Sequence, residues 1–343
     1  MAAAVTADEA PSLRQAAVLG AGSWGTTFAM VLADAGMPVR IWGRRADVVA
    51  EIRDSHRNSE YLPQTVLPDA VTASQDAAEV LDGADLVILA VPSQSLRANL
   101  AGWAPLISAE ALLVSLMKGV ELGTHLRMSE VVSGVSGAES HRVAVVSGPN
   151  LAAEIAARQP TATVVACADH RHAELVAASC STAYFRPYTQ TDVVGVEIGG
   201  AVKNVIALAV GIAEGLGFGD NTQASLITRG LAETARLAAA LGAEPATLAG
   251  LAGMGDLVAT CASPLSRNRT FGVNLGSGMT VQEVVAATRQ TAEGVKSCRS
   301  ILELASSVGV DVPIVQHVVH VVADGMPVRE MAGSLLSRSR KAE

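Results

Sequence analysis

The chain has 343 residues, a length that fits about two domains of roughly 150 residues each. Half of its residues are hydrophobic and 17% are charged, which excludes a disordered or fibrous chain. The formal net charge is −8 and the lysines and arginines form no block, which argues against a general nucleic-acid-binding or anionic-membrane surface.

Short runs of Val, Ile and Leu alternate with helix-like stretches in the first half of the chain, and this alternation predicts parallel β–α units. The first run is followed by helical spacing over Ser23–Ala35, which Gly36 ends. We therefore expect an α/β domain over residues 14–192, after a disordered extension over residues 1–13. The predicted strands are Ala16–Leu19, Val39–Trp42, Asp85–Val91, Leu112–Leu116, Val143–Ser147 and Ala162–Ala166.

The pattern changes at about Val193, where long stretches of Ala, Leu and Val with Gly and Pro interruptions replace the strands. This predicts an all-α domain over residues 193–336 and a solvated tail over residues 337–343. The best candidate for a membrane span, Val205–Ala213, has nine uncharged residues, well short of the ~20 that cross a bilayer. No integral membrane segment is expected.

Two further features predict a cytoplasmic protein. Cys167, Cys180, Cys261 and Cys298 are far apart and form no C-x-x-C pair, so we expect reduced thiols rather than disulfides or a zinc site. Residues Met1–Ser12 lack the basic start and the apolar run of a signal peptide.

A glycine-rich turn, Gly20-Ala21-Gly22-Ser23-Trp24-Gly25, directly follows the first predicted strand and opens the first helix. In such a turn the first glycine permits the tight bend, the second lets the backbone approach a pyrophosphate, and the third lets helix and strand come close. The helix N-terminus supplies amide donors to the phosphates. The motif alone is weak, but its place between strand and helix favours dinucleotide binding over a structural turn.

The end of the second strand indicates which dinucleotide the turn suits. An NAD-specific site usually carries Asp or Glu there for the ribose hydroxyls. Here Arg44 and Arg45 follow Gly43, and no carboxylate precedes Asp47. Two guanidinium groups suit a 2′-phosphate, although two solvated arginines at a helix start would give the same pattern. We predict that NADP(H) binds and that NAD(H) is tolerated.

Lys203 stands in an otherwise apolar, helix-like stretch. Such a lysine either extends to the surface or is partly desolvated. In the second case its pKa falls toward neutral pH, and it can exchange a proton with a substrate oxygen. Gly195, Gly199 and Gly200 favour the second case because they let another backbone or a ligand approach, and Asn204 adds a polar group. The residues alone leave both interpretations open.

Three further polar positions have a structural and a functional interpretation each. Asp256 lies in a glycine-flanked turn, where it is either a helix N-cap or a carboxylate that orients a nearby lysine. Ser266, Arg267 and Asn268 follow a predicted turn and form either an exposed, capped helix start or an anion site. Lys118 follows a predicted strand, which places it at the ligand edge of the sheet, and by itself this position leaves a functional and a purely structural role equally open.

These segments belong to a series of short motifs whose order and spacing are specific. The motifs are Gly-Ala-Gly-Ser-Trp-Gly (20–25), Tyr61-Leu62-Pro63, Met117-Lys118-Gly119, Ser147-Gly148-Pro149-Asn150, Ala201-Val202-Lys203-Asn204, Gly253-Met254-Gly255-Asp256, Ser266-Arg267-Asn268-Arg269 and Glu293-Gly294. Over nearly the whole chain, they resemble the bacterial NAD(P)-dependent glycerol-3-phosphate dehydrogenases.

The resemblance implies reversible hydride transfer between NAD(P)H and dihydroxyacetone phosphate, giving sn-glycerol 3-phosphate for phospholipid synthesis. It also implies an N-terminal Rossmann-type domain, an all-α C-terminal domain like that of 6-phosphogluconate dehydrogenase, and often a homodimer. Lys203 would be the proton donor and acceptor. The implied substrate contacts are Lys118, Gly148, Asn150, Lys203, Asp256, Ser266, Arg267 and Asn268. The implied cofactor contacts are Gly20, Gly22, Ser23, Trp24, Gly25, Arg44, Arg45, Tyr61, Lys118, Ala152, Arg267 and Glu293.

Asn150 departs from the family pattern, which usually has Ser or Thr there; we expect its amide to donate to the substrate. The chemistry agrees with the family, because hydride addition to a ketone leaves an alkoxide that needs a proton donor and a cation. No metal is expected, since the histidines form no motif with acidic or thiol partners. Two other functions stay open: a β-hydroxyacid or 6-phosphogluconate-type dehydrogenase, and an NADP sensor without catalysis.

Overall fold

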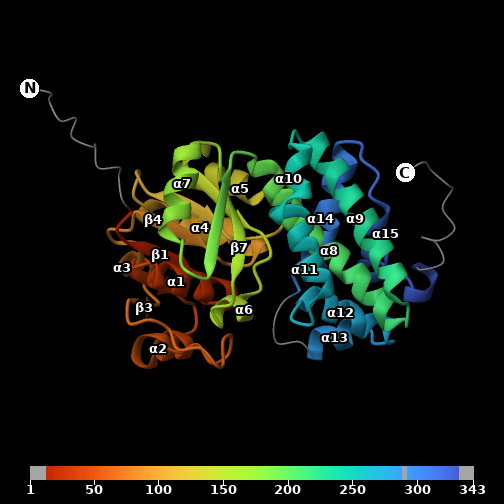
Figure 1. Ribbon diagram of the computed structural model, residues 1–343, viewed down its shortest axis with the longest axis horizontal. Coiled ribbons are helices and arrows are strands. Elements are labelled where there is room, and N and C mark those ends of the chain that lie inside the picture. Colours follow the sequence, from red (N-terminus) through yellow and green to blue (C-terminus); the bar gives the residue numbers. More distant parts are fainter. Residues whose placement is uncertain (1–12, 288–291, 332–343) are drawn as a thin grey trace, which may run out of the picture.

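The computed structural model describes residues 13–287 and 292–331, which form two parts side by side (Figure 1). The sheet domain holds all strands of the described residues and the helices between them. The helical domain follows the last strand. The predicted tail over 337–343, and the predicted extension over 1–13 except for its last residue, lie outside the described residues. The predicted order of an α/β domain before an all-α domain is confirmed.

Eight strands form one sheet in the order β3-β2-β1-β4-β5-β6-β7-β8. The pairs from β3 across to β6 are parallel, β7 runs antiparallel to β6, and β8 is parallel to β7. The chain reverses its direction of winding between β1 and β4, and doubly wound sheets bind dinucleotides at such a point. The strands are β1 Ala16–Leu19, β2 Val39–Trp42, β3 Val71–Ser74, β4 Leu86–Leu89, β5 Leu112–Ser115, β6 Val143–Ser147, β7 Thr161–Cys167 and β8 Phe185–Gln190.

Both faces of the sheet are covered, because alternate side chains of β1 enter two different cores. Ala16 and Val18 belong to one hydrophobic cluster, and Ala17 and Leu19 belong to another. Central strands with two buried faces are uniformly apolar, as the sequence shows. The covering helices are α1 Ser23–Asp34, α2 Ala46–Ser55, α3 Ala77–Leu81, α4 Leu96–Trp103, α5 Met128–Ser136, α6 Ala152–Ala156 and α7 His170–Ser179, with short 3₁₀ turns at Ser93–Ser95, Ala104–Leu106 and Ser140–Arg142.

All six predicted strands are present, with ends within two residues of the prediction, but two edge strands were not predicted. β3 has four residues and buries only Val71 and Ala73 fully, so its apolar signal is weak. β8 contains Pro187, which normally argues against a strand. Proline is tolerated there because β8 pairs with a neighbour on one side only.

The helical domain is built around α8, whose residues from Gly195 to Ala213 are all buried. By length and composition alone α8 would be long enough to cross a membrane, although it contains no uncharged run of that length. Its surroundings are those of a core helix, because 89% of its apolar window is buried by the rest of the protein. The domain comprises α8 Val193–Gly215, α9 Asp220–Ala240, α10 Pro245–Ala249, a π-helical turn at Leu251–Gly255, α11 Asp256–Ala262, α12 Arg267–Gly276, α13 Val281–Ala287, α14 Glu293–Ser307 and α15 Pro313–Ala323.

Glycines let α12 lie directly against the backbone of α8. A Cβ atom at Gly211 would be 2.1 Å from the carbonyl oxygen of Arg269, and one at Gly272 would be 2.3 Å from that of Leu208. Gly215 and Gly276 meet in the same way one turn later. This close packing fixes the start of α12 beside the middle of α8.

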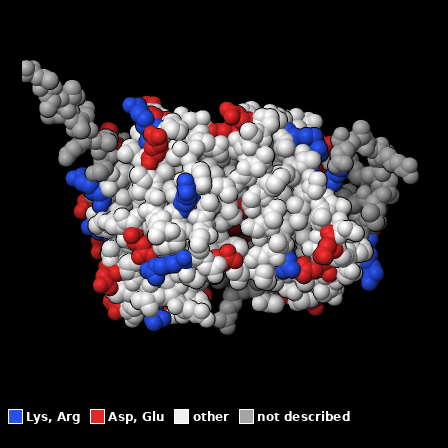
Figure 2. Space-filling model, viewed as in Figure 1, with Lys and Arg blue, Asp and Glu red and all other residues white. Residues whose placement is uncertain are grey.

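The distribution of charged side chains on the surface agrees with the negative net charge of the chain. On the face shown in Figure 2, acidic and basic side chains are scattered among neutral ones and form no continuous basic area. This face offers no electrostatic footprint for a nucleic acid.

Candidate active site

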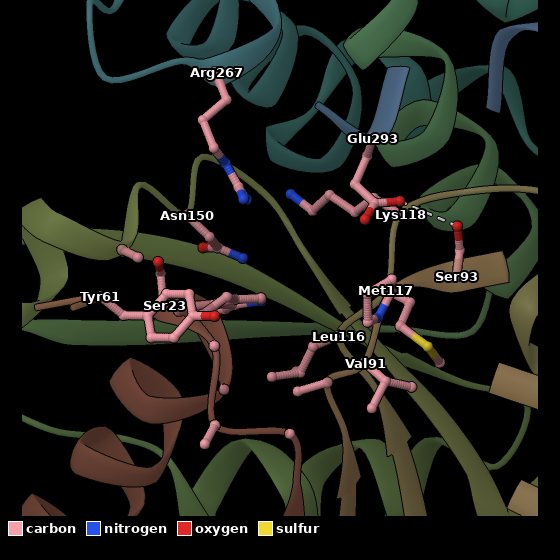
Figure 3. A pocket seen from close by; sticks show the side chains of 18 of the residues that line it. Ser23, Tyr61, Val91, Ser93, Leu116, Met117, Lys118, Asn150, Arg267 and Glu293 are labelled. Atoms are coloured by element: carbon pink, nitrogen blue, oxygen red, sulfur yellow. Dashed lines mark hydrogen bonds between the residues drawn. The ribbon is translucent and has the colours of Figure 1, made fainter. Parts of the chain in front are cut away.

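A cleft of about 890 Å³ lies between the two domains, at the carboxyl ends of β1 and β4. Its walls come from the glycine turn and the segment after β4 on one side, and from α8, α12 and α14 on the other (Figure 3). Every predicted site residue except Gly148 and Asp256 lines it. The sequence therefore located one continuous cavity from segments that are far apart in the chain.

The three glycines of the turn have different surroundings. Gly20 has a φ of +132°, and a Cβ atom there would be 2.5 Å from the carbonyl oxygen of Ala90. A Cβ at Gly25 would be 2.1 Å from the carbonyl oxygen of Gly20, so this glycine permits the contact between helix and turn. Gly22 has no atom within 4 Å of its Cβ position, and α1 begins at Ser23 without a side-chain cap. Open space in front of uncapped amides fits a pyrophosphate.

The two arginines after β2 differ in their partners. Arg45 forms ion pairs with Asp47, at 2.5 Å, and with Glu60, and these acidic partners raise its pKa. Among the residues that the structure describes, no hydrogen bond or ion pair engages the guanidinium of Arg44. Both line the cleft, but Arg44 alone has an uncommitted charge.

Lys203 of α8 points into a cluster of polar side chains. Its Nζ donates to Oδ1 of Asp256 and to Oγ1 of Thr260, the latter at 2.6 Å. The second oxygen of the Asp256 carboxylate accepts from Nζ of Lys118 at 2.6 Å. Lys118 also donates to the carbonyl oxygen of Gly148 at 3.1 Å. One carboxylate therefore holds two lysines, one from each domain.

Burial changes the proton affinity of Lys203. The residue is 8% exposed, and desolvation is the largest cause that lowers its pKa, to about 7. Asp256 opposes this shift, and the positive charge of Lys118 adds to it. A lysine with a pKa near neutral pH can both donate and accept a proton under working conditions. The structure thus favours desolvation over surface extension for Lys203.

Asp256 is not a helix cap. It is the first residue of α11, and its side chain contacts the two lysines instead of a backbone N–H. Close backbone packing positions it, because a Cβ at Gly199 of α8 would be 2.6 Å from the carbonyl oxygen of Ala252. A Cβ at Gly200 would be 2.7 Å from Oγ of Ser147. These two α8 glycines permit the close approach that the sequence predicted.

The start of α12 forms the other wall of the lysine pocket. Nδ2 of Asn268 donates to Oδ1 of Asn204 at 2.9 Å, and Oδ1 of Asn268 accepts from the amide of Gly294 at 3.0 Å. Ser266 caps α12 by accepting from the amide of Arg269. Arg267 extends into the cleft (Figure 3). This helix start therefore carries both a side-chain cap and a cationic side chain that lines the cleft.

The side chain of Asn150 is held by Thr163 of β7. Oγ1 of Thr163 donates to the carbonyl oxygen of Ser147, so it must accept from Nδ2 of Asn150, which lies 3.0 Å away. The remaining atom, Oδ1, is buried without a partner. Thr163 therefore engages only one of the two amide hydrogens of Asn150, and donation by this amide to the substrate stays a prediction.

Several site residues lie at the border between cleft and core. Tyr61 and Trp24 line the cleft and pack against the core of the sheet domain, and Ala152 begins α6. Oε2 of Glu293 accepts from Oγ of Ser93 at 3.1 Å across the cleft, and burial raises the pKa of this glutamate.

Comparison with known proteins identifies the family. The family models for the N-terminus and the C-terminus of NAD-dependent glycerol-3-phosphate dehydrogenase match residues 15–173 and 192–333. The chain belongs to this family.

Members of the glycerol-3-phosphate dehydrogenase family are similar over the whole fold. A glycerol-3-phosphate dehydrogenase [NAD(P)+] of Streptomyces griseus is 63% identical over 96% of this chain and 98% of its own length. One of Thermobifida fusca is 59% identical over 96% and 99%. The crystal structure of a glycerol-3-phosphate dehydrogenase from Coxiella burnetii has a TM-score of 0.91 at 37% identity and covers 96% of this chain and all of its own. The protein is thus an NAD(P)-dependent oxidoreductase with a Rossmann-type domain.

A likeness to a ketopantoate reductase is limited to the fold. A ketopantoate reductase from Ralstonia eutropha has a TM-score of 0.59 at 18% identity.

Two residues of the site, Thr260 and Ser93, were not predicted from the sequence. Thr260 lies four residues after Asp256, and residues four apart share one face of a helix. This spacing could have predicted that Thr260 of α11 lies beside Asp256.

Proposed function

We propose that Lys203 exchanges the proton when this protein interconverts dihydroxyacetone phosphate and sn-glycerol 3-phosphate with NADPH or NADH. The observation that carries this proposal is the buried cluster in which Asp256 holds both Lys203 and Lys118 at the cleft. A sensor that only binds NADP has no use for a desolvated lysine.

Two positive charges serve the reaction at the ketone oxygen. When bound, the reduced nicotinamide supplies a hydride to the carbonyl carbon. Lys203 then donates a proton to the oxygen, and Lys118 stabilises the negative charge that develops there. Asp256 keeps both amines oriented and offsets their repulsion. In the reverse direction neutral Lys203 accepts the proton of the alcohol.

The cofactor would be held by residues of both domains. The uncapped start of α1 and the open face of Gly22 would take the pyrophosphate, and Arg44 would take a 2′-phosphate. The full set of proposed cofactor residues is Gly20, Gly22, Ser23, Trp24, Gly25, Arg44, Arg45, Tyr61, Lys118, Ala152, Arg267 and Glu293.

The substrate would be anchored through its phosphate. Arg267 extends into the cleft from the start of α12, where cationic and amide groups suit a phosphate. Binding energy at the phosphate then aligns the ketone with Lys203. The full set of proposed substrate residues is Lys118, Gly148, Asn150, Lys203, Asp256, Ser266, Arg267 and Asn268.

Four wider features belong to the same proposal. Reduction of dihydroxyacetone phosphate would supply glycerol 3-phosphate for phospholipid synthesis. A cytoplasmic location is supported by four buried, unpaired cysteines. We place the domain boundary at 192/193, between the end of β8 at Gln190 and the start of α8 at Val193. The resemblance supports a homodimer, which analytical ultracentrifugation would measure.

The deciding experiment follows NADPH oxidation with dihydroxyacetone phosphate in wild type and Lys203→Ala. We expect kcat to fall by about 10²-fold or more, because the proton donor is lost, while NADPH affinity stays within about threefold. Lys296→Ala is the control, since Lys296 lines the same cleft without an ion pair to Asp256. Near-normal turnover in Lys203→Ala would contradict the role, and a preference for β-hydroxyacids would contradict the substrate.

A further inference from the structure

The segment from Lys118 to Ser129, which connects β5 to α5, belongs by sequence to the sheet domain but packs against the helical domain. Val120 is fully buried and is part of the hydrophobic cluster of the helical domain. Its carbonyl oxygen accepts from Oγ of Ser300 at 2.8 Å, and His125 lies 3.1 Å from Glu303. We call residues 118–129 the connecting segment. It is the part of the sheet domain that carries Lys118.

Glu197 of α8 joins the far end of the connecting segment. Its Oε2 accepts from Nη1 of Arg127 and from Oγ of Ser129, both at 2.6 Å. Its Oε1 accepts from the amide of Ser129 at 2.8 Å, in the first turn of α5. Glu197 is 6% exposed, so this is a fully hydrogen-bonded carboxylate in the interior between the domains.

We propose that Glu197 is a positioning residue for the proton transfer, because it fixes the helix that carries Lys203 relative to the segment that carries Lys118. This inference rests on the proposed role of Lys203. Neither Glu197 nor Arg127 lines the cleft, so the effect on the reaction passes through these two elements.

The contacts form a closed frame with little free space. The connecting segment carries Lys118 at its start and Arg127 near its end, while α8 carries Lys203 and Glu197 about two turns apart. Between these two attachments, a Cβ at Gly200 would be 2.7 Å from Oγ of Ser147 and 3.5 Å from Cγ of Lys118. A shift of α8 at Glu197 therefore changes the distance between the two amines.

A purely structural role has a different consequence, and the chain offers a matched control. Glu233 of α9 is also a buried glutamate, 2% exposed, and it accepts from a backbone amide at the start of a helix, that of Ile314 at 2.9 Å. It contacts neither the cleft nor the connecting segment. Replacing either glutamate by Gln removes one buried carboxylate that accepts from a helix-start amide; burial raises the pKa of Glu233 to about 7, so Glu233→Gln also removes a charge above that pH.

The pH dependence of the reaction depends on the distance between the amines of Lys203 and Lys118. Lys203 faces Asp256 and Cys261 of α11 and Lys118 of the connecting segment. Asp256 moves with Lys203 because both belong to the helical domain, so separation of the connecting segment weakens only the repulsion from Lys118. The pKa of Lys203 then rises from about 7. Oxidation of glycerol 3-phosphate needs neutral Lys203, so its rising limb moves to higher pH.

The experiment measures glycerol 3-phosphate oxidation by NADP+ from pH 5.5 to 9 in the full-length wild type, Glu197→Gln and Glu233→Gln, together with urea unfolding. For Glu197→Gln we expect kcat to fall about tenfold, the KM for NADP+ to stay within about twofold, and the limb to rise by about 0.5 pH unit. For Glu233→Gln we expect a lower unfolding midpoint with kcat and the limb unchanged. Matching kcat values and limbs in the two variants would overturn the inference.

A second variant covers the case that Glu197→Gln does not fold. Ser129→Ala removes one donor to the carboxylate and keeps the charge of Arg127, and we expect about a threefold loss of kcat with a limb shifted in the same direction. Unchanged kcat and limb in this variant would overturn the inference. An inactive wild type, or an active Lys203→Ala, would instead contradict the proposed function.

Discussion

The glycine turn and the lysine cluster face the same cleft but are made in opposite ways. The turn consists of six consecutive residues whose backbone forms the proposed binding surface, and its geometry follows from glycines at fixed positions. The cluster joins Lys118, Lys203 and Asp256 from two domains, and its furthest pair is 138 positions apart in the sequence. The comparison shows that a binding site made of backbone groups is determined by a short stretch of sequence. The proton affinity of a side chain, in contrast, depends on the groups that the fold packs around it.

The largest expected effect tests the cluster. Asp256→Asn removes the one negative charge between two lysines, so the pKa of Lys203 should fall below about 7 and fewer molecules carry the proton needed for reduction. We expect kcat for reduction at pH 7 to fall about 10²-fold. In the oxidation direction the rising limb should move to lower pH, opposite to the shift expected for Glu197→Gln.

The control for this variant is Thr260→Val, which removes a hydrogen-bond acceptor from Lys203 without changing any charge. Its effect should be about threefold to tenfold. An Asp256→Asn protein with an unmoved limb would mean that Asp256 does not set the proton affinity of Lys203.

The second prediction separates two glycines of the turn. In Gly25→Ala the new Cβ meets the carbonyl oxygen of Gly20 at 2.1 Å, so α1 must move, and we expect the free energy of unfolding to fall by about 2–3 kcal/mol. In Gly22→Ala the Cβ meets nothing, so stability should change by less than about 1 kcal/mol while NADPH affinity falls about tenfold. Urea unfolding and NADPH fluorescence titration measure the two effects. Equal loss of stability in both variants would contradict the assignment of a packing role to Gly25 and a cofactor-binding role to Gly22.

The smallest effect concerns the two arginines. Arg44→Ala should raise the KM for NADPH about tenfold and leave that for NADH within about twofold, because only the 2′-phosphate loses its partner. Arg45→Ala should change the KM for NADPH by about threefold at most, since Arg45 is already paired with Asp47 and Glu60. Steady-state assays with both cofactors measure this. Equal losses for NADPH and NADH in Arg44→Ala would remove the 2′-phosphate argument.

Most of the fold was predictable because its central strands are apolar on both faces and its domains differ in pattern. The strands that escaped prediction are those whose signal is diluted by solvent or by a proline, β3 and β8. α8 was predicted as helix-like, but its role as the core of a domain follows from the helices around it and from the glycine contacts with α12.

The site was predictable as a set of positions and less so as chemistry. Asn150 was predicted as a cleft residue and lines the cleft, but only the fold shows that Thr163, thirteen residues away, accepts one of its two amide hydrogens. Arg45 was predicted as a cation for the cofactor phosphate, but in the fold its guanidinium forms an ion pair with Glu60. Such pairings depend on which side chains meet in space, and no spacing rule contains that information.

The amino-acid order by itself determined the alternation of strands and helices, the dinucleotide turn and the change to helices at Val193, because backbone geometry and apolar periodicity are local properties. The tertiary structure decided that Lys203 is buried, that Asp256 is its partner, and that Glu197 of α8 bonds to the segment that carries Lys118. Desolvation and Coulomb interaction act through space, so the proton affinity at the centre of this dehydrogenase exists only once the two domains are packed together.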